Sequence, residues 1–101
     1  MEIVIDDRLD EFIDSLTKTA KARCRHVMRM LASEGRNLGM PHSKKIHLKL
    51  WELRVKGELE IRLLYGITKN KASLVHGFLK KSNKTPKKEI DTALKRLYNL
   101  K

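Results

Sequence analysis

The spacing of apolar residues changes along the chain from a helical to a strand period and back, and this change constrains the fold most. From residue 9 to residue 31 apolar residues recur every three or four positions, which is typical of helices with one buried face. From residue 51 to residue 79 they alternate with polar residues or run together, as they do in strands. After residue 85 the helical spacing returns. We therefore expect strands that are preceded by two helices and followed by one.

The first half of the chain predicts a short strand, two helices and a loop. Residues 2–5 can form the strand, and Asp6 or Asp7 can cap the first helix. The second helix is expected to end at Gly35, and the Gly, Pro and Asn content of residues 36–45 predicts a loop. The inner faces of the two helices are expected to hold Leu9, Phe12, Ile13, Leu16, Ala20, Cys24, Val27, Met28 and Leu31.

The turn between the first two of the following strands decides which charged side chains meet. A three-residue turn over residues 56–58 keeps the apolar alternation on one face, whereas a two-residue turn would break it. This turn pairs Arg54 with Glu60. It also pairs Glu52 with Arg62.

The next hairpin is expected to turn near Lys69-Asn70 or across residues 68–71. Either choice places Arg62 on the face of Gly77 and Lys81, with His76 and Lys80 on the opposite face. A twist or bulge where the chain leaves the sheet, near Ser82-Asn83, could bring Lys80 and Lys81 inward together. One face of the sheet is then apolar and takes the helices. The other face is expected to be polar, with open room above Gly77.

Charge is unevenly distributed along the chain, whose net charge is +11. Residues 1–16 carry six acidic residues and one basic residue, while residues 17–101 carry a net charge of +16. Such a field favours a polyanionic partner, with nucleic acid first and an anionic membrane surface second.

Length and cysteine content bound the remaining possibilities. The 101 residues fit a single domain, and no apolar run approaches the roughly 20 residues that span a bilayer. The acidic N-terminus argues against a signal peptide. The one cysteine, Cys24, allows no intrachain disulfide and is expected in the core, so we expect a cytoplasmic protein.

The segment HGFLKKSNKTPKKEI, residues 76–90, gathers positive charge where a strand gives way to a helix. Thr85 is expected to cap that helix, with Pro86 at its first position. A helix N-terminus attracts anions, so lysines placed there suggest that an anion binds among them. The five lysines of this junction are Lys80, Lys81, Lys84, Lys87 and Lys88.

Phosphate chemistry suits the predicted polar face better than other chemistry does. Arg54 and Arg62 offer planar forks to phosphate oxygens, and Lys80 and Lys81 add mobile charge. In RNA the 2′-hydroxyl is already beside the phosphorus, so cleavage requires proton transfer and charge stabilisation. The four histidines and the single cysteine show no metal-ligand spacing, and no catalytic triad is evident. We expect neither a metal nor a cofactor.

Three segments resemble the HigB-type toxins of the RelE superfamily, which belong to phage- and plasmid-associated toxin–antitoxin pairs. They are LWELRV (50–55), IRLLYGI (61–67) and LVHGFLKKSNKTPKKEI (74–90), and the similarity extends over about residues 46–98. The resemblance implies a RelE-like α+β fold with an N-terminal helical pair, a twisted, mostly antiparallel sheet of three to four strands, and a C-terminal helix.

The resemblance also implies a function and a partner. It implies a metal-independent mRNA endoribonuclease that acts on ribosome-bound message, and a HigA-like helix-turn-helix antitoxin. Carried over by position, the catalytic residues are Arg54, Arg62, Lys80 and Lys81. Some members place a tyrosine in the last segment, where this chain has Thr85-Pro86, so the lysines carry more of the prediction. We assign RNA binding to Lys84, Lys87, Lys88 and His76.

Other interpretations of the same residues remain open. A non-catalytic RNA- or ribosome-binding module on this fold would show the same charge. A structural phage protein whose basic patch binds an acidic partner is a further alternative. Arg54 and Arg62 can also be plain cross-strand partners of glutamates. A small neighbouring reading frame that encodes a helix-turn-helix protein would favour the toxin.

Overall fold

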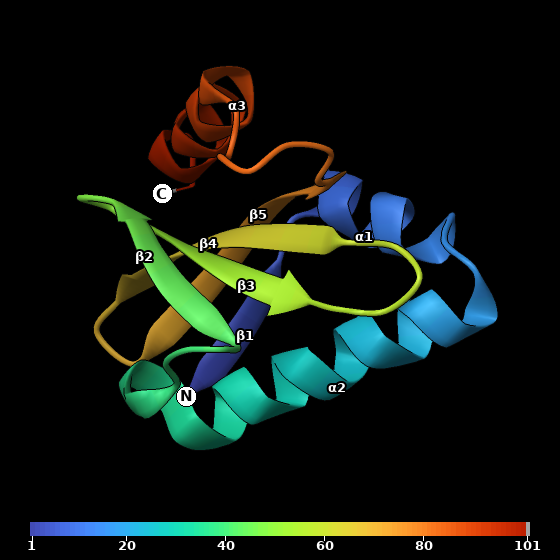
Figure 1. The fold of residues 1–101 in the computed structure, drawn as a ribbon. Helices are drawn as coiled ribbons and strands as arrows, with labels where there is room; N and C mark the ends of the chain where they lie inside the picture. Colours follow the sequence, from blue (N-terminus) through green and yellow to red (C-terminus); the bar gives the residue numbers. More distant parts are fainter. Residues whose placement is uncertain (101) are drawn as a thin grey trace.

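The computed structural model describes residues 1–100 and shows a five-stranded mixed sheet with helices on both faces (Figure 1). The elements are β1 (Glu2–Ile5), α1 (Asp7–Asp14), α2 (Lys18–Glu34), a short 3-10 helix η1 (Gly35–Asn37), β2 (Ser43–His47), β3 (Leu50–Val55), β4 (Ile61–Thr68), β5 (Lys71–Leu79) and α3 (Lys87–Tyr98). The strand order is β1-β5-β4-β3-β2, with β1 parallel to β5 and the other neighbours antiparallel. α1 and α2 pack on one face and α3 on the other.

The N-terminal helices form where the apolar spacing predicted them. Asp6 caps α1 and Thr17 caps α2, each by accepting a hydrogen bond from a backbone N–H of the first turn. α2 ends at Gly35 as predicted, and its φ of 57° lies in the left-handed region that favours glycine. Cys24 is fully buried in the larger core, as predicted. Within residues 1–100 no helix has the length and apolar character needed to cross a membrane.

β2 makes the fifth strand, although its segment was predicted to be a loop. It begins at Ser43, whose buried hydroxyl forms a 2.5 Å hydrogen bond with the Tyr65 hydroxyl. Its other side chains are partly or fully exposed, and both Lys44 and Lys45 are exposed. A charged edge strand of this kind is held by its backbone and leaves no apolar alternation in the sequence. The prediction of three to four strands was therefore too low.

The hairpin between β3 and β4 is longer than the predicted three-residue turn. Residues 56–60 connect the two strands, and Leu59, predicted to lie in a strand, is 39% exposed in this loop. Arg54 consequently lies opposite Arg62 instead of Glu60. The register moves by an even number of residues, so these side chains stay on the faces predicted for them.

The β4–β5 hairpin turns at Lys69-Asn70 as predicted, but a bulge then reverses the expected faces. The register pairs on its two sides are Tyr65 with Leu74 and Leu64 with His76. One residue of β5 is therefore extra, and the alternation beyond it is inverted. Arg62 lies opposite Phe78, and His76 is on the face of Arg62, where the prediction had placed it on the other.

Gly77 lies against α1, which corrects the prediction that it leaves open room beside Arg62. A Cβ built on Gly77 would lie 2.7 Å from Leu9 Cδ1 and 2.8 Å from Phe12 Cδ2. The missing side chain thus allows α1 to approach the sheet. The other face is not open either, because α3 packs on Leu64 and Phe78 in a second, smaller core.

The last helix begins one residue later than expected and has a different cap. Pro86 occupies the N-cap position, and no side chain caps the helix. Thr85, which was predicted to be the cap, instead donates its hydroxyl to Glu52 on β3. This contact ties the segment before α3 to the sheet.

The close approach of α1 to Gly77 gives a test of the packing. Gly77→Ala is expected to lower the free energy of unfolding by about 1–3 kcal/mol, because the added methyl group overpacks the Leu9 and Phe12 contacts. Gly39→Ala is the matched control, since a Cβ there would meet no atom within 4 Å. Urea unfolding followed by circular dichroism compares the two variants. Equal stability of both would contradict the packing described here.

Candidate nucleic-acid interface

A buried glutamate on β3 organises the polar part of the sheet. Only 1% of the Glu52 side chain is exposed, and its Oε1 lies 3.3 Å from the Nε of Arg54 and 3.3 Å from the Nε of Arg62. Its Oε2 accepts the hydrogen bond from Thr85. A buried carboxylate persists only where such partners compensate its lost hydration. Glu52 thereby joins β3, β4 and the segment between β5 and α3.

Arg62 is held almost entirely inside this cluster. Its side chain is 5% exposed, and its terminal nitrogens donate to the Ile61 carbonyl at 3.1 Å and to Glu60 Oε1 at 3.2 Å. The Nε atom of Arg62 has no hydrogen-bond partner within residues 1–100. Arg62 and Glu52 therefore form an ion pair through this atom, but not a well-directed hydrogen bond. Arg54 is more accessible, with 16% of its side chain exposed, and it donates through Nε to Glu52.

Two adjoining cavities lie beside this cluster, and together they form what we call the basic cleft. Their volumes are about 290 Å³ and 320 Å³, and both are lined by Lys80 and Asn83. The first is also lined by Lys44, Lys45, Arg54, Lys84 and Glu52. The second is also lined by Arg62, Lys81 and Glu60. The lining of the basic cleft thus contains seven basic side chains and two acidic ones.

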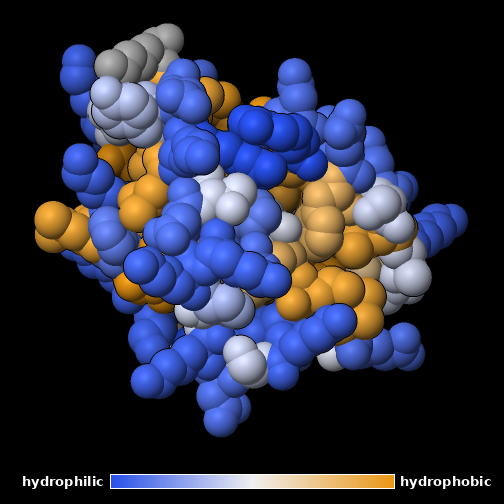
Figure 2. Space-filling model, turned by 90° about the horizontal axis from the view of Figure 1, so that it is seen from above, coloured by the Kyte–Doolittle hydropathy of each residue, from blue (hydrophilic) through white to orange (hydrophobic). Residues whose placement is uncertain are grey.

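The surface around α3 and the segment before it is strongly hydrophilic. Figure 2 shows this side from above, with hydrophilic residues in blue over most of the surface and hydrophobic residues in orange gathered in patches. Lys81 and Lys84 are exposed in the segment before α3. Positive charge in a concave site attracts phosphate more strongly than the same charge on a flat surface.

The structure brings five of the eight predicted site residues together in the basic cleft. These five are Arg54, Arg62, Lys80, Lys81 and Lys84. Strand parity alone placed Lys80 on the face opposite to Arg62, but β5 contains a bulge, although earlier than Ser82-Asn83, and Lys80 lines the second cavity together with Arg62. The Lys80 N–H donates to the Glu60 carbonyl at 2.8 Å. Lys87 and Lys88 are exposed at the start of α3 and do not line the cleft.

His76 belongs to a separate group that fastens α3 to β5. Its Nε2 lies 2.7 Å from Glu89 Oε1, and its Nδ1 lies 3.2 Å from a terminal nitrogen of Arg96. Because arginine can only donate, Nδ1 accepts and the proton of this tautomer is on Nε2. Both partners belong to α3. His76 is therefore occupied in positioning the helix.

Sequence reasoning missed the contributions of β2 and of Glu52. Lys44 and Lys45 reach the cleft from a segment predicted to be a loop, and the doubled lysine in HSKKIH was the signal available. Glu52 was considered only as a cross-strand partner at the surface. Its neighbours Trp51 and Leu53 point to the other face, so the local sequence gives no sign of its burial.

The basic cleft offers cations and hydrogen-bond donors but no activated thiol or phenol. Cys24 lies in the core, where burial raises the pKa of its thiol to about 11. Burial also raises the pKa of Tyr65, whose hydroxyl is bonded to Ser43. Within residues 1–100 no three His, Cys, Asp or Glu side chains are grouped so as to hold a metal ion. The guanidinium and ammonium groups present can bind and polarise phosphate.

Fold and cleft together define a small α+β protein with a concave basic surface suited to a polyanion. The chain matches the family described as "Phage derived protein Gp49-like (DUF891)" over residues 11–98, and it belongs to this family. The family is RelE/toxin-like, and the match does not single out HigB-type toxins. No curated protein matches the chain.

The Thr85–Glu52 contact can be tested with two matched substitutions. Thr85→Val is expected to lower the free energy of unfolding by about 1–3 kcal/mol, because a buried carboxylate oxygen loses a donor. Thr85→Ser keeps the hydroxyl and is expected to change stability by no more than about 0.5 kcal/mol. Urea unfolding at neutral pH measures both. A valine variant as stable as the serine variant would show that the contact does not hold this segment.

Proposed function

We propose that this protein is the HigB-type toxin of a type II toxin–antitoxin pair and that it cleaves messenger RNA. The observation that carries the proposal is the basic cleft, where Lys80 and Lys81 line the same cavities as Arg54 and Arg62, and a buried glutamate holds both arginines. Membership of a RelE/toxin-like family supports it. In this proposal the reaction needs no metal ion or cofactor and takes place on the ribosome, in the cytoplasm.

The substrate supplies the nucleophile, so the protein moves protons and balances charge. The ribose 2′-oxygen attacks the adjacent phosphorus while a base takes its proton, and the 5′-oxygen leaves with a proton from an acid. The product is a 2′,3′-cyclic phosphate. We assign the two proton transfers to Lys80 and Lys81, because Lys80 lines both cavities of the cleft and Lys81 lines one.

The two arginines have different tasks in this proposal. Arg54 is partly exposed in the cleft and contacts the phosphate, while Arg62, at 5% exposure, lines the second cavity and holds Glu52 and Glu60 in place. Glu52 fixes both guanidinium groups before substrate arrives. Charges that are already fixed stabilise the phosphorane-like transition state without a cost of reorganisation.

The lysines around the cleft provide contacts to phosphates on either side of the cleaved bond. Lys84, from the segment before α3, and Lys44 and Lys45, from β2, line the same cavity as Arg54. Lys87 and Lys88 lie at the exposed start of α3, where they add long-range attraction. We no longer assign RNA contact to His76, because Glu89 and Arg96 engage both of its ring nitrogens.

The proposal includes a HigA-like helix-turn-helix antitoxin as a protein partner. Its gene is expected beside the gene of this chain. Expression of the chain alone should arrest growth, and coexpression of the neighbour should restore it. Growth that is unaffected by the chain alone would count against the toxin assignment.

The role of Lys80 can be tested against a matched lysine outside the cleft. Lys80→Ala is expected to lower the cleavage rate by on the order of 10²–10⁴, because one of the two proposed proton-transfer groups is lost. Lys95→Ala removes an exposed lysine of α3 that does not line the cleft and is expected to retain activity. Both are compared on translated message, with circular dichroism as the check of folding. Full activity of a folded Lys80→Ala protein would place the chemistry elsewhere.

The proposed nucleophile is tested by a message with a single 2′-deoxy residue at the scissile position. Cleavage at that position is expected to stop, while cleavage of the unmodified message yields a 2′,3′-cyclic phosphate or its opened form. Undiminished cleavage of the deoxy message would exclude the mechanism. Tight binding of both messages without any cleavage would instead favour a non-catalytic RNA-binding module.

A further inference from the structure

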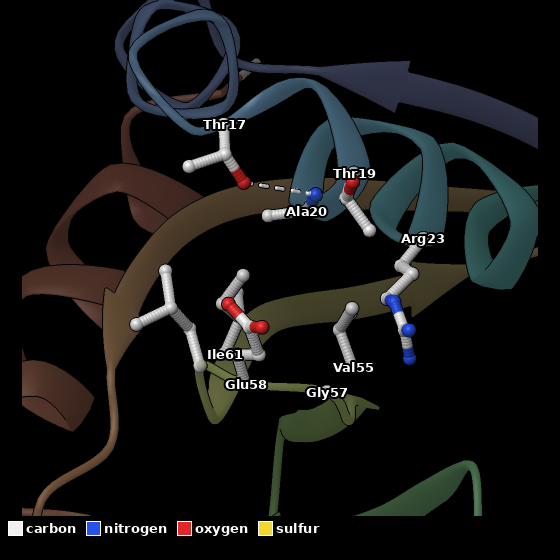
Figure 3. A pocket seen from close by; sticks show the side chains of 9 residues that line it. Thr17, Thr19, Ala20, Arg23, Val55, Gly57, Glu58 and Ile61 are labelled. Carbon is white, nitrogen blue, oxygen red and sulfur yellow. Dashed lines mark hydrogen bonds between the residues drawn. The ribbon is translucent and has the colours of Figure 1, made fainter.

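A second concave surface lies on the opposite side of the sheet, between α2 and the end of β3. It consists of two adjoining cavities of about 300 Å³ and 410 Å³, which share Thr19, Arg23 and Val55. We call this surface the α2 groove. Figure 3 shows the smaller cavity, with Thr17, Thr19 and Arg23 on the α2 side and Val55 and Glu58 across from them.

The floor of the α2 groove is apolar. It is formed by side chains that belong to the larger core, and Leu59 adds an apolar side chain that is 39% exposed at the edge. The aliphatic residues of the floor are Ala20, Val27, Val55 and Ile61.

The rim of the α2 groove is positively charged. Arg23, His26 and Lys56 are exposed there, and none of the three forms an ion pair within residues 1–100. The Arg23 guanidinium donates one hydrogen bond to the Lys56 carbonyl, at 3.0 Å. This bond holds the Arg23 side chain across the groove. His42 and Arg54 complete the rim on the side of the sheet, and Glu58 is the one acidic residue among the lining residues.

The groove lies beside the end of β3 that the edge strand leaves unpaired. β2 begins at Ser43, opposite Leu53, so it does not extend along the last two residues of β3, Arg54 and Val55. The neighbouring backbone contact is the bond from Arg54 N–H to the His42 carbonyl, at 2.8 Å. Beyond it, Val55 and the following turn line the groove together with residues of α2.

We propose that the α2 groove binds an acidic peptide segment of a partner protein, with apolar side chains in the two cavities and carboxylates on the rim. An apolar floor within a cationic rim matches a segment that alternates these two chemistries. RNA fits less well, because the aliphatic side chains of the floor offer no hydrogen-bond donor to phosphate or sugar oxygens. The inference does not depend on nuclease activity, because it rests on the apolar floor and the charged rim of the groove, which shares only Arg54 with the lining of the basic cleft.

The test measures binding of two labelled peptides to the full chain by fluorescence anisotropy. One peptide is rich in glutamate and carries two leucines; in the other, serine replaces both leucines at equal charge. The leucine peptide is expected to bind at least about tenfold more tightly, since burying a single leucine is worth roughly that factor. Equal affinities would show plain attraction between opposite charges and overturn the proposal.

Substitutions then locate the binding surface. Thr19→Trp fills both cavities from an exposed helical position, and Arg23→Glu reverses the rim charge; each is expected to weaken the leucine peptide about tenfold or more. Arg29→Glu is the matched control, because it makes the same change on an exposed position of α2 outside the groove. An equal loss with Arg29→Glu would overturn the proposal.

Two further outcomes would assign the groove to another occupant. If Thr19→Trp weakens binding of labelled single-stranded RNA and leaves the peptide unaffected, the groove is part of the RNA surface. If the chain alone sediments as a dimer that Thr19→Trp dissociates, a second copy occupies it. Either result overturns the peptide proposal, and loss of the nuclease proposal alone leaves it standing.

Discussion

Two arginines that face each other across β3 and β4 impose the constraint on which the polar half of this protein depends. Arg54 and Arg62 are register partners, and like charges directly opposite destabilise a sheet. Glu52 offsets this repulsion, because its Oε1 is 3.3 Å from both Nε atoms. With Glu60 on the second arginine, the centre is close to neutral. The net positive charge of the basic cleft therefore comes from the lysines around it, which surround a rigid centre.

The helices and strands could be predicted from sequence wherever their buried residues recur at a regular spacing along the chain. α1 and α2 bury one stripe each, and the alternation in β3 and β4 marks residues that pack against those stripes. β2 buries Ser43 through a hydroxyl pair with Tyr65, so it carries no such period. The bulge in β5 could not be predicted either, because Leu74 and Val75 are both apolar and both buried.

The sequence predicted which residues lie together in the cleft better than it predicted their register partners in the sheet. The error in the β3–β4 turn was even in length, so it left Arg54 and Arg62 on their common face. After the bulge, the residues of β5 lie on the face opposite to the predicted one. Lys80 therefore lies beside Arg62, and Gly77 lies against α1. What sequence could not supply was the burial of Glu52, since burial depends on α3 and on Thr85, which are distant along the chain.

Arg54 links the two concave surfaces, because it lines both the basic cleft and the α2 groove. Its guanidinium is bound to Glu52 on the cleft side, with 16% of the side chain exposed. A carboxylate that binds Arg54 from the groove competes with Glu52 and with a phosphate in the cleft for the same cation. Coupling of this kind is reciprocal, so an acidic peptide that weakens RNA binding must itself be weakened by RNA to the same extent. Because β2 begins at Ser43, opposite Leu53, Arg54 has no register partner on that side of β3, and a protein partner has access there to a residue that the proposed chemistry uses.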